Sequence, residues 1–247
     1  MNRNRIQQLI AAVALSSALV APALAQDAGD WEFGFGVGVV APNTSSDDLV
    51  FEGTSLDDFR VDVDDKFGIV VNATYFMSSN WGLELLASTP WKHDVNGAGA
   101  LEPLGELGSV KQLPPTLSLQ YHFRPNQTIR PYVGAGLNYT LFFDESTTTS
   151  LHEGIVATAN GALGTNYSGG STDLSVDDSF GLALQAGFDI ELTEAWFLNF
   201  DLRWIDIGVD AELQTNTFDG DDPITLNSAL DIDIDPWVFS TTVGFRF

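Results

Sequence analysis

The chain has 247 residues, no cysteine and a formal charge of −24 at pH 7, so disulfides and thiolate metal sites are excluded. An acidic balance of this size also opposes nucleic-acid binding, which needs basic surface to replace counterions at phosphates. Aromatic residues make up 11% of the chain, which argues against a disordered acidic polymer and for an ordered structure that buries these rings or immerses them in lipid.

Residues 1–25 match a cleaved secretory signal peptide. Arg3 and Arg5 give a positive start, residues 6–20 are almost wholly apolar, and Ala23-Leu24-Ala25 fits the small-x-small cleavage pattern. The apolar stretch is shorter than the roughly 20 residues that span a bilayer, which disfavours an uncleaved anchor helix. We therefore expect residues 26–247 to form the mature protein, as one outer-membrane barrel domain.

Eight segments of the mature chain alternate apolar residues with small or polar ones, which is typical of membrane-spanning barrel strands. In the first, Trp31, Phe33 and Phe35 share one face, and Gly34 and Gly36 share the other. The predicted strands lie near residues 31–39, 67–75, 81–87, 117–123, 133–141, 180–190, 196–204 and 237–247. No mature segment is apolar for long enough to make a membrane-spanning helix. The pattern predicts an all-β fold, an eight-stranded antiparallel up-and-down transmembrane β-barrel.

A soluble β-sandwich is the competing fold, because its strands also alternate. The outward faces of a sandwich must be polar enough to keep it in solution. Here the second faces of the first, fifth and sixth strands are rich in Gly, Ala, Asn and Thr rather than in charge. Small residues of this kind suit the narrow lumen of a small barrel, so the barrel is favoured.

The connections alternate in length. Short turns follow the second, fourth and sixth strands, and we expect long extracellular loops near residues 43–60, 91–112, 144–178 and 210–235. The loop at 144–178 is rich in Gly, Ser and Thr, so we expect it to be mobile and to serve as a lid. An even strand number places both termini in the periplasm. Aromatic girdles are expected at both membrane surfaces, with Trp31, Trp81, Trp196 and Phe247 on the periplasmic side and Trp91, Phe180, Trp204 and Trp237 on the outer side.

Several segments resemble the OmpW family of outer-membrane proteins, which includes the AlkL alkane-uptake proteins. The most specific are Asn80-Trp81-Gly82-Leu83-Glu84-Leu85, Leu113-Pro114-Pro115-Thr116 with Tyr121-His122-Phe123, the stretch from Arg130 to Tyr139, and the terminal Phe247. The resemblance covers the mature chain. It implies an eight-stranded barrel in the outer membrane of a Gram-negative bacterium, with an apolar lumen that passes small hydrophobic molecules from outside toward the membrane through a lateral opening.

Placing each inward-facing residue at a height predicts an apolar outer lumen above a charged inner one. The predicted apolar lumen comprises Val40, Leu86, Phe142, Ile205, Ile207, Val209, Ile232, Ile234 and Val238. The predicted charge plug comprises Glu84, Asp189, Asp201, Arg203 and Arg246. The same placement points Asp62 and Lys66 inward near the outer end, and Phe76 and Tyr132 inward near the periplasmic end.

Eight strands leave no wide aqueous channel, and buried charges persist only with partners. We therefore expect ion pairs that block straight passage, and a hydrophobic solute that leaves sideways into lipid. The alternative from the residues alone is a filled, inert core, as in a structural barrel or a receptor for phage, bacteriocin or host. The strands after residue 204 and before residue 237 are expected to project past the membrane with an apolar interior, because aspartates alternate there with isoleucines.

Enzyme activity is not predicted. His93 and His152 lie in expected loops, and His122 faces inward without a Ser–Asp partner in a known motif. A lipid-modifying barrel enzyme is the less favoured alternative. No cofactor and no dedicated metal site are expected, since the aspartates between 206 and 235 lack the spacing of a calcium-binding loop.

The expected partners follow from this location. They are outer-membrane lipid, lipopolysaccharide with divalent cations shared at the acidic loops, small hydrophobic solutes, and the barrel-assembly machinery, which would bind the C-terminal Phe247.

Overall fold

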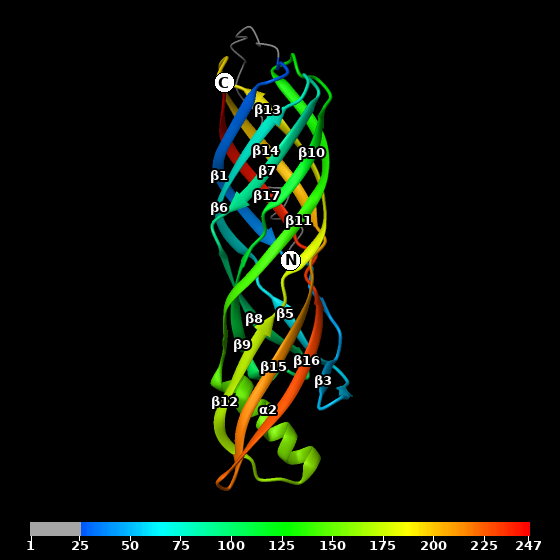
Figure 1. The fold of residues 1–247 in the computed structure, drawn as a ribbon, viewed down its shortest axis with the longest axis vertical. Coiled ribbons are helices and arrows are strands. Elements are labelled where there is room, and N and C mark those ends of the chain that lie inside the picture. Colours follow the sequence, from blue (N-terminus) through cyan, green and yellow to red (C-terminus); the bar gives the residue numbers. More distant parts are fainter. Residues whose placement is uncertain (1–25) are drawn as a thin grey trace.

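The computed structural model describes residues 26–247, and the expected signal peptide lies outside the described residues. Eight strands form the barrel: β1 (Trp31–Ala41), β6 (Lys66–Phe76), β7 (Trp81–Ser88), β10 (Thr116–His122), β11 (Ile129–Thr147), β13 (Ser179–Glu191), β14 (Trp196–Ile205) and β17 (Trp237–Arg246). Each pairs antiparallel with the next, and β1 pairs with β17 to close the cylinder (Figure 1). The predicted eight-stranded up-and-down barrel is confirmed.

Alternation along the strands creates the two surfaces of the barrel. On β1 every second side chain is exposed, and Phe35 keeps 62% of its surface accessible whereas Val40 keeps 1%. The register places Phe35 between Val71 of β6 and Val243 of β17, so the apolar side chains form a continuous outer band. An exposed apolar band of this extent is unfavourable in water and stable in contact with hydrocarbon, so the outer surface of the barrel faces lipid.

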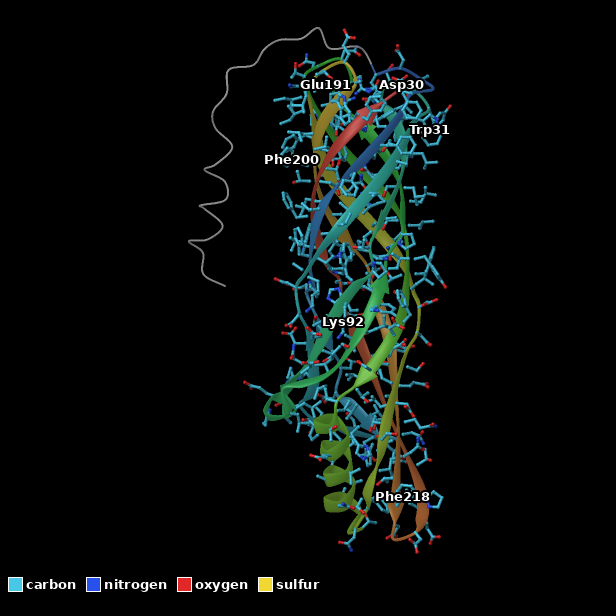
Figure 2. The ribbon with its side chains drawn as sticks, turned by 90° about the vertical axis from the view of Figure 1, so that its left-hand side faces the viewer. Asp30, Trp31, Lys92, Glu191, Phe200 and Phe218 are labelled. Atoms are coloured by element: carbon cyan, nitrogen blue, oxygen red, sulfur yellow. The ribbon has the colours of Figure 1, made fainter. Side chains whose placement is uncertain are left out.

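Most of the expected girdle residues are exposed at the ends of the strands. Figure 2 shows Trp31 near the periplasmic end, with Phe218 near the opposite tip of the molecule. Trp91 is an exception and the prediction for it was wrong, because its side chain is 97% buried. Its indole packs on Gly68, where an added Cβ would lie 1.9 Å from Nε1 of Trp91. Pro90 precedes Trp91 and shifts the alternation, so the ring turns inward.

Beyond the barrel the chain continues as two facing sheets, which we call the extension. One sheet contains β5 (Phe59–Val63), β8 (Trp91–Gly99), β9 (Glu106–Leu113) and the outer half of β11. The other contains β12 (Ser168–Val176), β15 (Gly208–Asp219) and β16 (Asp222–Asp233), with β2 (Ser45–Ser46), β3 (Leu49–Phe51) and β4 (Thr54–Leu56) at its edge. The long connections expected in these regions are present but consist largely of paired strands, and strands continue beyond residue 204 as expected.

A helix and a short 3-10 turn lie in the extension. They are α2 (Thr149–Leu163), which lies beside β12 in Figure 1, and η1 (Glu102–Leu104). Thr148 caps the helix by accepting a hydrogen bond from the Leu151 amide at 3.2 Å, and Gly164 ends it with a left-handed φ of 69°. The segment 144–178, expected to be a mobile loop, therefore contains a capped helix and a strand. Among the described residues, no helix is both long and apolar enough to cross a membrane.

Prolines separate the barrel from the extension at one position, which we call the proline break. The last pair of the β7–β10 ladder is Leu86 with Thr116, and the first pair of β8–β9 is Trp91 with Gln112. Within this described part of the chain, no ladder pairs join residues 87–90 to residues 113–115. Pro90, Pro114 and Pro115 lie in these segments, and proline has no amide hydrogen to donate to a ladder. At this position the barrel wall therefore has no ladder hydrogen bonds between these two segments.

Candidate functional site

The periplasmic half of the barrel interior is closed by three buried arginines and their carboxylate partners. Arg130 is central: its Nη2 lies 3.0 Å from Oε1 of Glu32 and 3.3 Å from Oδ2 of Asp189, and its Nε lies 3.2 Å from Glu191. Arg246 joins the same group through Glu32 and Glu191, each at 2.7 Å. Arg130 and Arg246 both pair with Glu32 and Glu191, so the removal of one arginine also weakens the surroundings of the other.

A second arginine group lies nearer the middle of the barrel. Nη2 of Arg203 lies 2.5 Å from Oε1 of Glu84, and its Nε lies 3.4 Å from Asp201. The Tyr132 hydroxyl donates to Asp201 at 2.9 Å, and Asn199 donates both to that hydroxyl and to Asp189. Asn199 therefore connects the two groups into one network, which we call the plug. All five predicted plug residues belong to it.

Arg130 and Glu32 are part of the plug but were not among its predicted residues. Arg130 is fully buried and alternates in phase with Tyr132, which was expected to face inward. The alternation along β11 that points Tyr132 into the barrel also points Arg130 inward. Room for the plug comes from small residues: Gly244 faces Phe197, where an added Cβ would lie 2.1 Å from the ring, and the Arg130 guanidinium lies 5.5 Å from the centre of that ring.

All nine residues of the predicted apolar lumen are buried and belong to one apolar cluster. They divide into two groups. The first group packs into one buried cluster at the outer end of the barrel and comprises Val40, Leu86, Ile205, Ile207 and Val238. Ile205 and Ile207 are essentially inaccessible to solvent. Phe142, Val209, Ile232 and Ile234 instead line a cavity in the extension. The first group is a packed layer, and the second surrounds open space.

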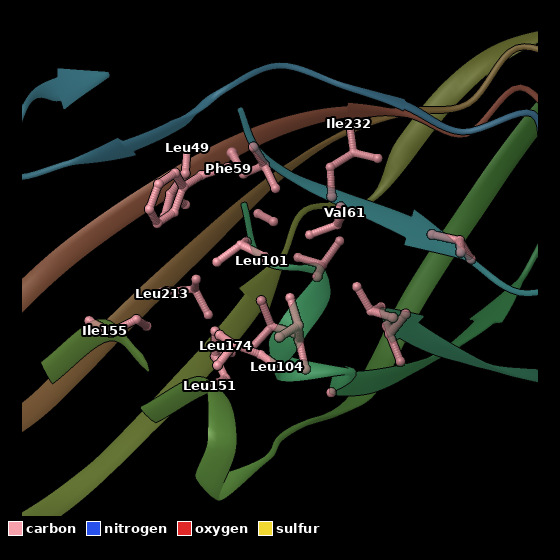
Figure 3. Close-up of a pocket in the computed structure, with 18 of the residues that line it drawn as sticks. Leu49, Phe59, Val61, Leu101, Leu104, Leu151, Ile155, Leu174, Leu213 and Ile232 are labelled. Carbon is pink, nitrogen blue, oxygen red and sulfur yellow. The ribbon is translucent and has the colours of Figure 1, made fainter. Parts of the chain in front are cut away.

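The cavity, which we call the chamber, has a volume of about 300 Å³. Both sheets, α2 and η1 contribute to its wall, including Leu49, Phe59, Leu101, Leu104, Ile155, Leu174, Leu213 and Ile232 (Figure 3). Val61 and Val63 of β5 also line it, so Asp62 between them is exposed. The inward placement of Asp62 was wrong, because Asp64 and Asp65 interrupt the strand and reset its phase before β6.

Lys66 is half-buried and forms an ion pair of 2.6 Å with Asp94, so its predicted inward position is partly right. The ammonium group holds the pKa of the Asp94 carboxyl below its usual value. Phe76 and Tyr132 are buried at the periplasmic end, as predicted. His122 is buried beside the plug, with its Nε2 3.1 Å from Oε1 of Gln120.

His93 and Gln112 are buried polar residues in the chamber wall. Nδ1–H of His93 donates to the Asp64 carbonyl oxygen at 2.8 Å, so its Nε2 accepts from Nε2 of Gln112 at 2.9 Å. Burial lowers the pKa of His93, and the nearby Lys66 acts in the same direction against Asp64 and Asp94. The bonding pattern therefore fits a neutral imidazole. His152 is held by Thr172 and by the Gly169 carbonyl oxygen.

The alternating aspartates lie on the exposed face of the extension. Asp210 and Asp231 are direct cross-strand partners, and the charge of Asp210 raises the pKa of Asp231. No group of three or more potential ligands suited to a metal ion occurs within residues 26–247.

Comparisons with known proteins agree with this architecture. The model of the OmpW family matches residues 27–247. Outer membrane protein W of Vibrio cholerae is 37% identical, covering 98% of this chain and all of the relative, and outer membrane protein AlkL of Ectopseudomonas oleovorans is 27% identical, covering 89% and 83%. The crystal structure of OprG from Pseudomonas aeruginosa superposes with a TM-score of 0.75 at 33% identity, covering 90% of this chain and 98% of OprG. The chain belongs to the OmpW family of outer-membrane β-barrel proteins.

Proposed function

We propose that the protein takes small hydrophobic molecules from the extracellular side into the chamber and releases them sideways into the outer membrane. The observation that carries the proposal is the vertical order of the interior: an apolar chamber outside, a packed apolar layer below it, and the plug at the periplasmic end. Burial of apolar surface favours entry of a hydrophobic solute by about 25 cal/mol for each Å² removed from water.

The plug makes direct passage to the periplasm unfavourable. A solute would have to separate Arg130 and Arg203 from their carboxylates in a space that water barely reaches. Breaking one buried ion pair costs about 3–5 kcal/mol, and an apolar solute offers no hydrogen bonds in return. Lipid, by contrast, accepts such a solute at little cost.

The proline break offers the sideways route. It lies directly below the chamber, because Gln112 lines the chamber and Leu113 to Pro115 follow it along the chain. Without ladder hydrogen bonds between residues 87–90 and 113–115, separation of the wall there breaks fewer bonds than anywhere along β1 or β17.

Filling the chamber tests the proposal. Leu213→Trp places a large ring in the chamber, and we expect it to slow naphthalene uptake into proteoliposomes at least about tenfold, since the substitution removes the volume that the solute needs. Gln214→Trp is the matched control, because the neighbouring side chain faces outward on the same strand. Equal uptake by both folded variants would contradict the proposal.

A charge in the chamber wall gives a second test. Ile232→Asp should reduce uptake strongly, because an ionised carboxylate in an apolar wall repels a hydrophobic solute. Asp233→Asn is the control on the exposed face of β16. Uptake that survives Ile232→Asp would place the route elsewhere.

A further inference from the structure

The geometry points to selection by a hydrogen bond inside the chamber: Gln112 gives it a preference for neutral hydrophobic molecules that carry one hydroxyl or carbonyl group over plain hydrocarbons. This inference rests on the proposed uptake function and names the class of solute that the chamber takes.

Three of the side chains that line the chamber are polar: His93, Gln112 and Thr158. Thr158 donates its hydroxyl hydrogen to the Gly154 carbonyl oxygen at 2.8 Å within α2. Both ring nitrogens of His93 are engaged, one by Asp64 and the other by Gln112. Among these three, Gln112 alone keeps unused donor and acceptor capacity.

Gln112 uses one hydrogen of its amide nitrogen to reach His93, and its Oε1 accepts no hydrogen bond from any described residue. The side chain is 98% buried. Oε1 of Gln112 can accept a hydrogen bond from an arriving hydroxyl, whereas a hydrocarbon has no hydrogen to donate, so the hydroxyl-bearing solute is favoured. The second amide hydrogen can donate to a carbonyl oxygen in the same way. His93 fixes the amide, so the solute does not have to order it.

The position of Gln112 sets the orientation of a bound molecule. Its ladder partners are Trp91 and Phe142, at the membrane-facing end of the chamber and next to the proline break. The rest of the wall, which extends outward past Leu213 to Ile155, is apolar. A solute would therefore bind with its polar group toward the membrane and its apolar body toward the extracellular tip.

Anions are disfavoured at the same place. Neither lysine nor arginine is among the residues that line the chamber in the described part of the chain, and Lys66, whose charge acts on His93, is engaged by Asp94 at 2.6 Å. A carboxylate entering the chamber would lose its hydration without gaining a free cation. The preferred class is thus neutral, and chamber volume limits it to molecules about the size of a two-ring aromatic or a medium-length alcohol.

Three probes of the same shape test this inference: naphthalene, 1-naphthol and 1-naphthoate. Their affinities are measured by fluorescence titration of the full mature protein in nanodiscs, with empty nanodiscs as the blank. We expect the ratio of 1-naphthol to naphthalene affinity to fall about three- to tenfold in Gln112→Leu, the value of one uncharged hydrogen bond. Naphthalene affinity should stay within about twofold, and 1-naphthoate should not bind. Gln214→Leu, the same substitution at an exposed glutamine of β15, is the matched control and should leave the ratio unchanged.

The outcomes separate the two proposals. An unchanged ratio in Gln112→Leu, with naphthalene still bound, would overturn the hydrogen-bond preference and leave the uptake function standing. Absence of naphthalene binding to the wild-type protein would instead contradict the uptake function. Because Gln112→Leu leaves Nε2 of His93 without a partner, the double variant His93→Phe/Gln112→Leu provides a second folded background, and the same change in ratio is expected there.

Discussion

The chamber and the plug occupy different parts of the interior of the same cylinder, and they are stabilised by different forces. The chamber wall is apolar and encloses about 300 Å³ of space, whereas the plug fills its part of the barrel with ions that satisfy one another. Apolar contacts are non-directional and tolerate small changes, but a buried ion pair depends on every member. Under the proposed function, apolar solutes enter at the chamber end and the plug closes the periplasmic end.

The largest expected effect is the loss of an arginine from the plug. Arg130→Met leaves Glu32, Asp189 and Glu191 short of a cation, and we expect a loss of about 3–5 kcal/mol in the free energy of unfolding. Reversible urea unfolding in lipid bilayers measures this loss. Arg60→Met, at a half-exposed ion pair in the extension, should change stability by less than about 1 kcal/mol. Similar losses in both variants would mean that the buried ion pairs of the plug contribute no more stability than an exposed ion pair.

Truncation should distinguish the packed layer from the chamber wall. Ile207→Ala in the packed layer should cost about 2–5 kcal/mol, because its side chain is surrounded on all sides. Ile232→Ala should cost about half as much, since one side of Ile232 already borders open space and fewer contacts are lost. Unfolding free energies of the two variants give the comparison. Equal costs would indicate that the chamber is filled by side chains in solution.

The pH dependence of stability should report the neutral state of His93. Because burial lowers the pKa of His93 in the folded protein, the unfolded chain binds the proton more readily. This histidine therefore contributes stability above pH about 6.5, and that contribution is lost as the pH falls toward the folded pKa. His93→Gln should have a shallower decline than wild type between pH 8 and 5, at about 1.4 kcal/mol for each unit of pKa difference. Parallel curves would argue against a neutral buried imidazole.

The smallest effect is expected on the exposed acidic face. Asp231→Asn relieves the repulsion from Asp210 across the ladder, and we expect a gain of a few tenths of a kcal/mol at low ionic strength. The gain should shrink at 0.15 M salt, because exposed charges are screened. Magnesium that cancels the gain at much lower concentration than sodium would support the expected sharing of divalent cations. No difference between the two salts would leave only a solvated acidic surface.

Much of the barrel could be predicted from the sequence, because lipid demands apolar side chains at every second position without interruption. The same alternation predicts that Ile205, Ile207 and Val238 lie inside the barrel. Arg130 lies two residues before Tyr132 on the same face of β11 and is also inside. Asp189 is the ladder partner of Arg130 on the neighbouring β13, whereas Glu32 reaches it from β1 across the barrel, so the individual ion pairs depend on the register and on closure of the barrel.

The extension was harder to predict for physical reasons. Proline at 90 and adjacent aspartates at 64–65 interrupt the alternation, so Trp91 and Asp62 were assigned to the wrong faces. Helix α2 contains Gly154 and Gly161, which lower helix propensity and disguise a segment that Thr148 and Gly164 nonetheless cap. The chamber arises from the gap between two facing sheets, and no local pattern encodes its volume.

Photolabelling tests the central claim most directly. A diazirine-bearing alkane of medium length, activated on the protein in lipid bilayers, should modify inward side chains of the chamber such as Leu213 and Ile232, together with residues of the proline break. Inward side chains of the plug, such as Tyr132 and Phe197, should stay unlabelled. Labels on the plug residues with none in the chamber would contradict an apolar path that ends in the membrane.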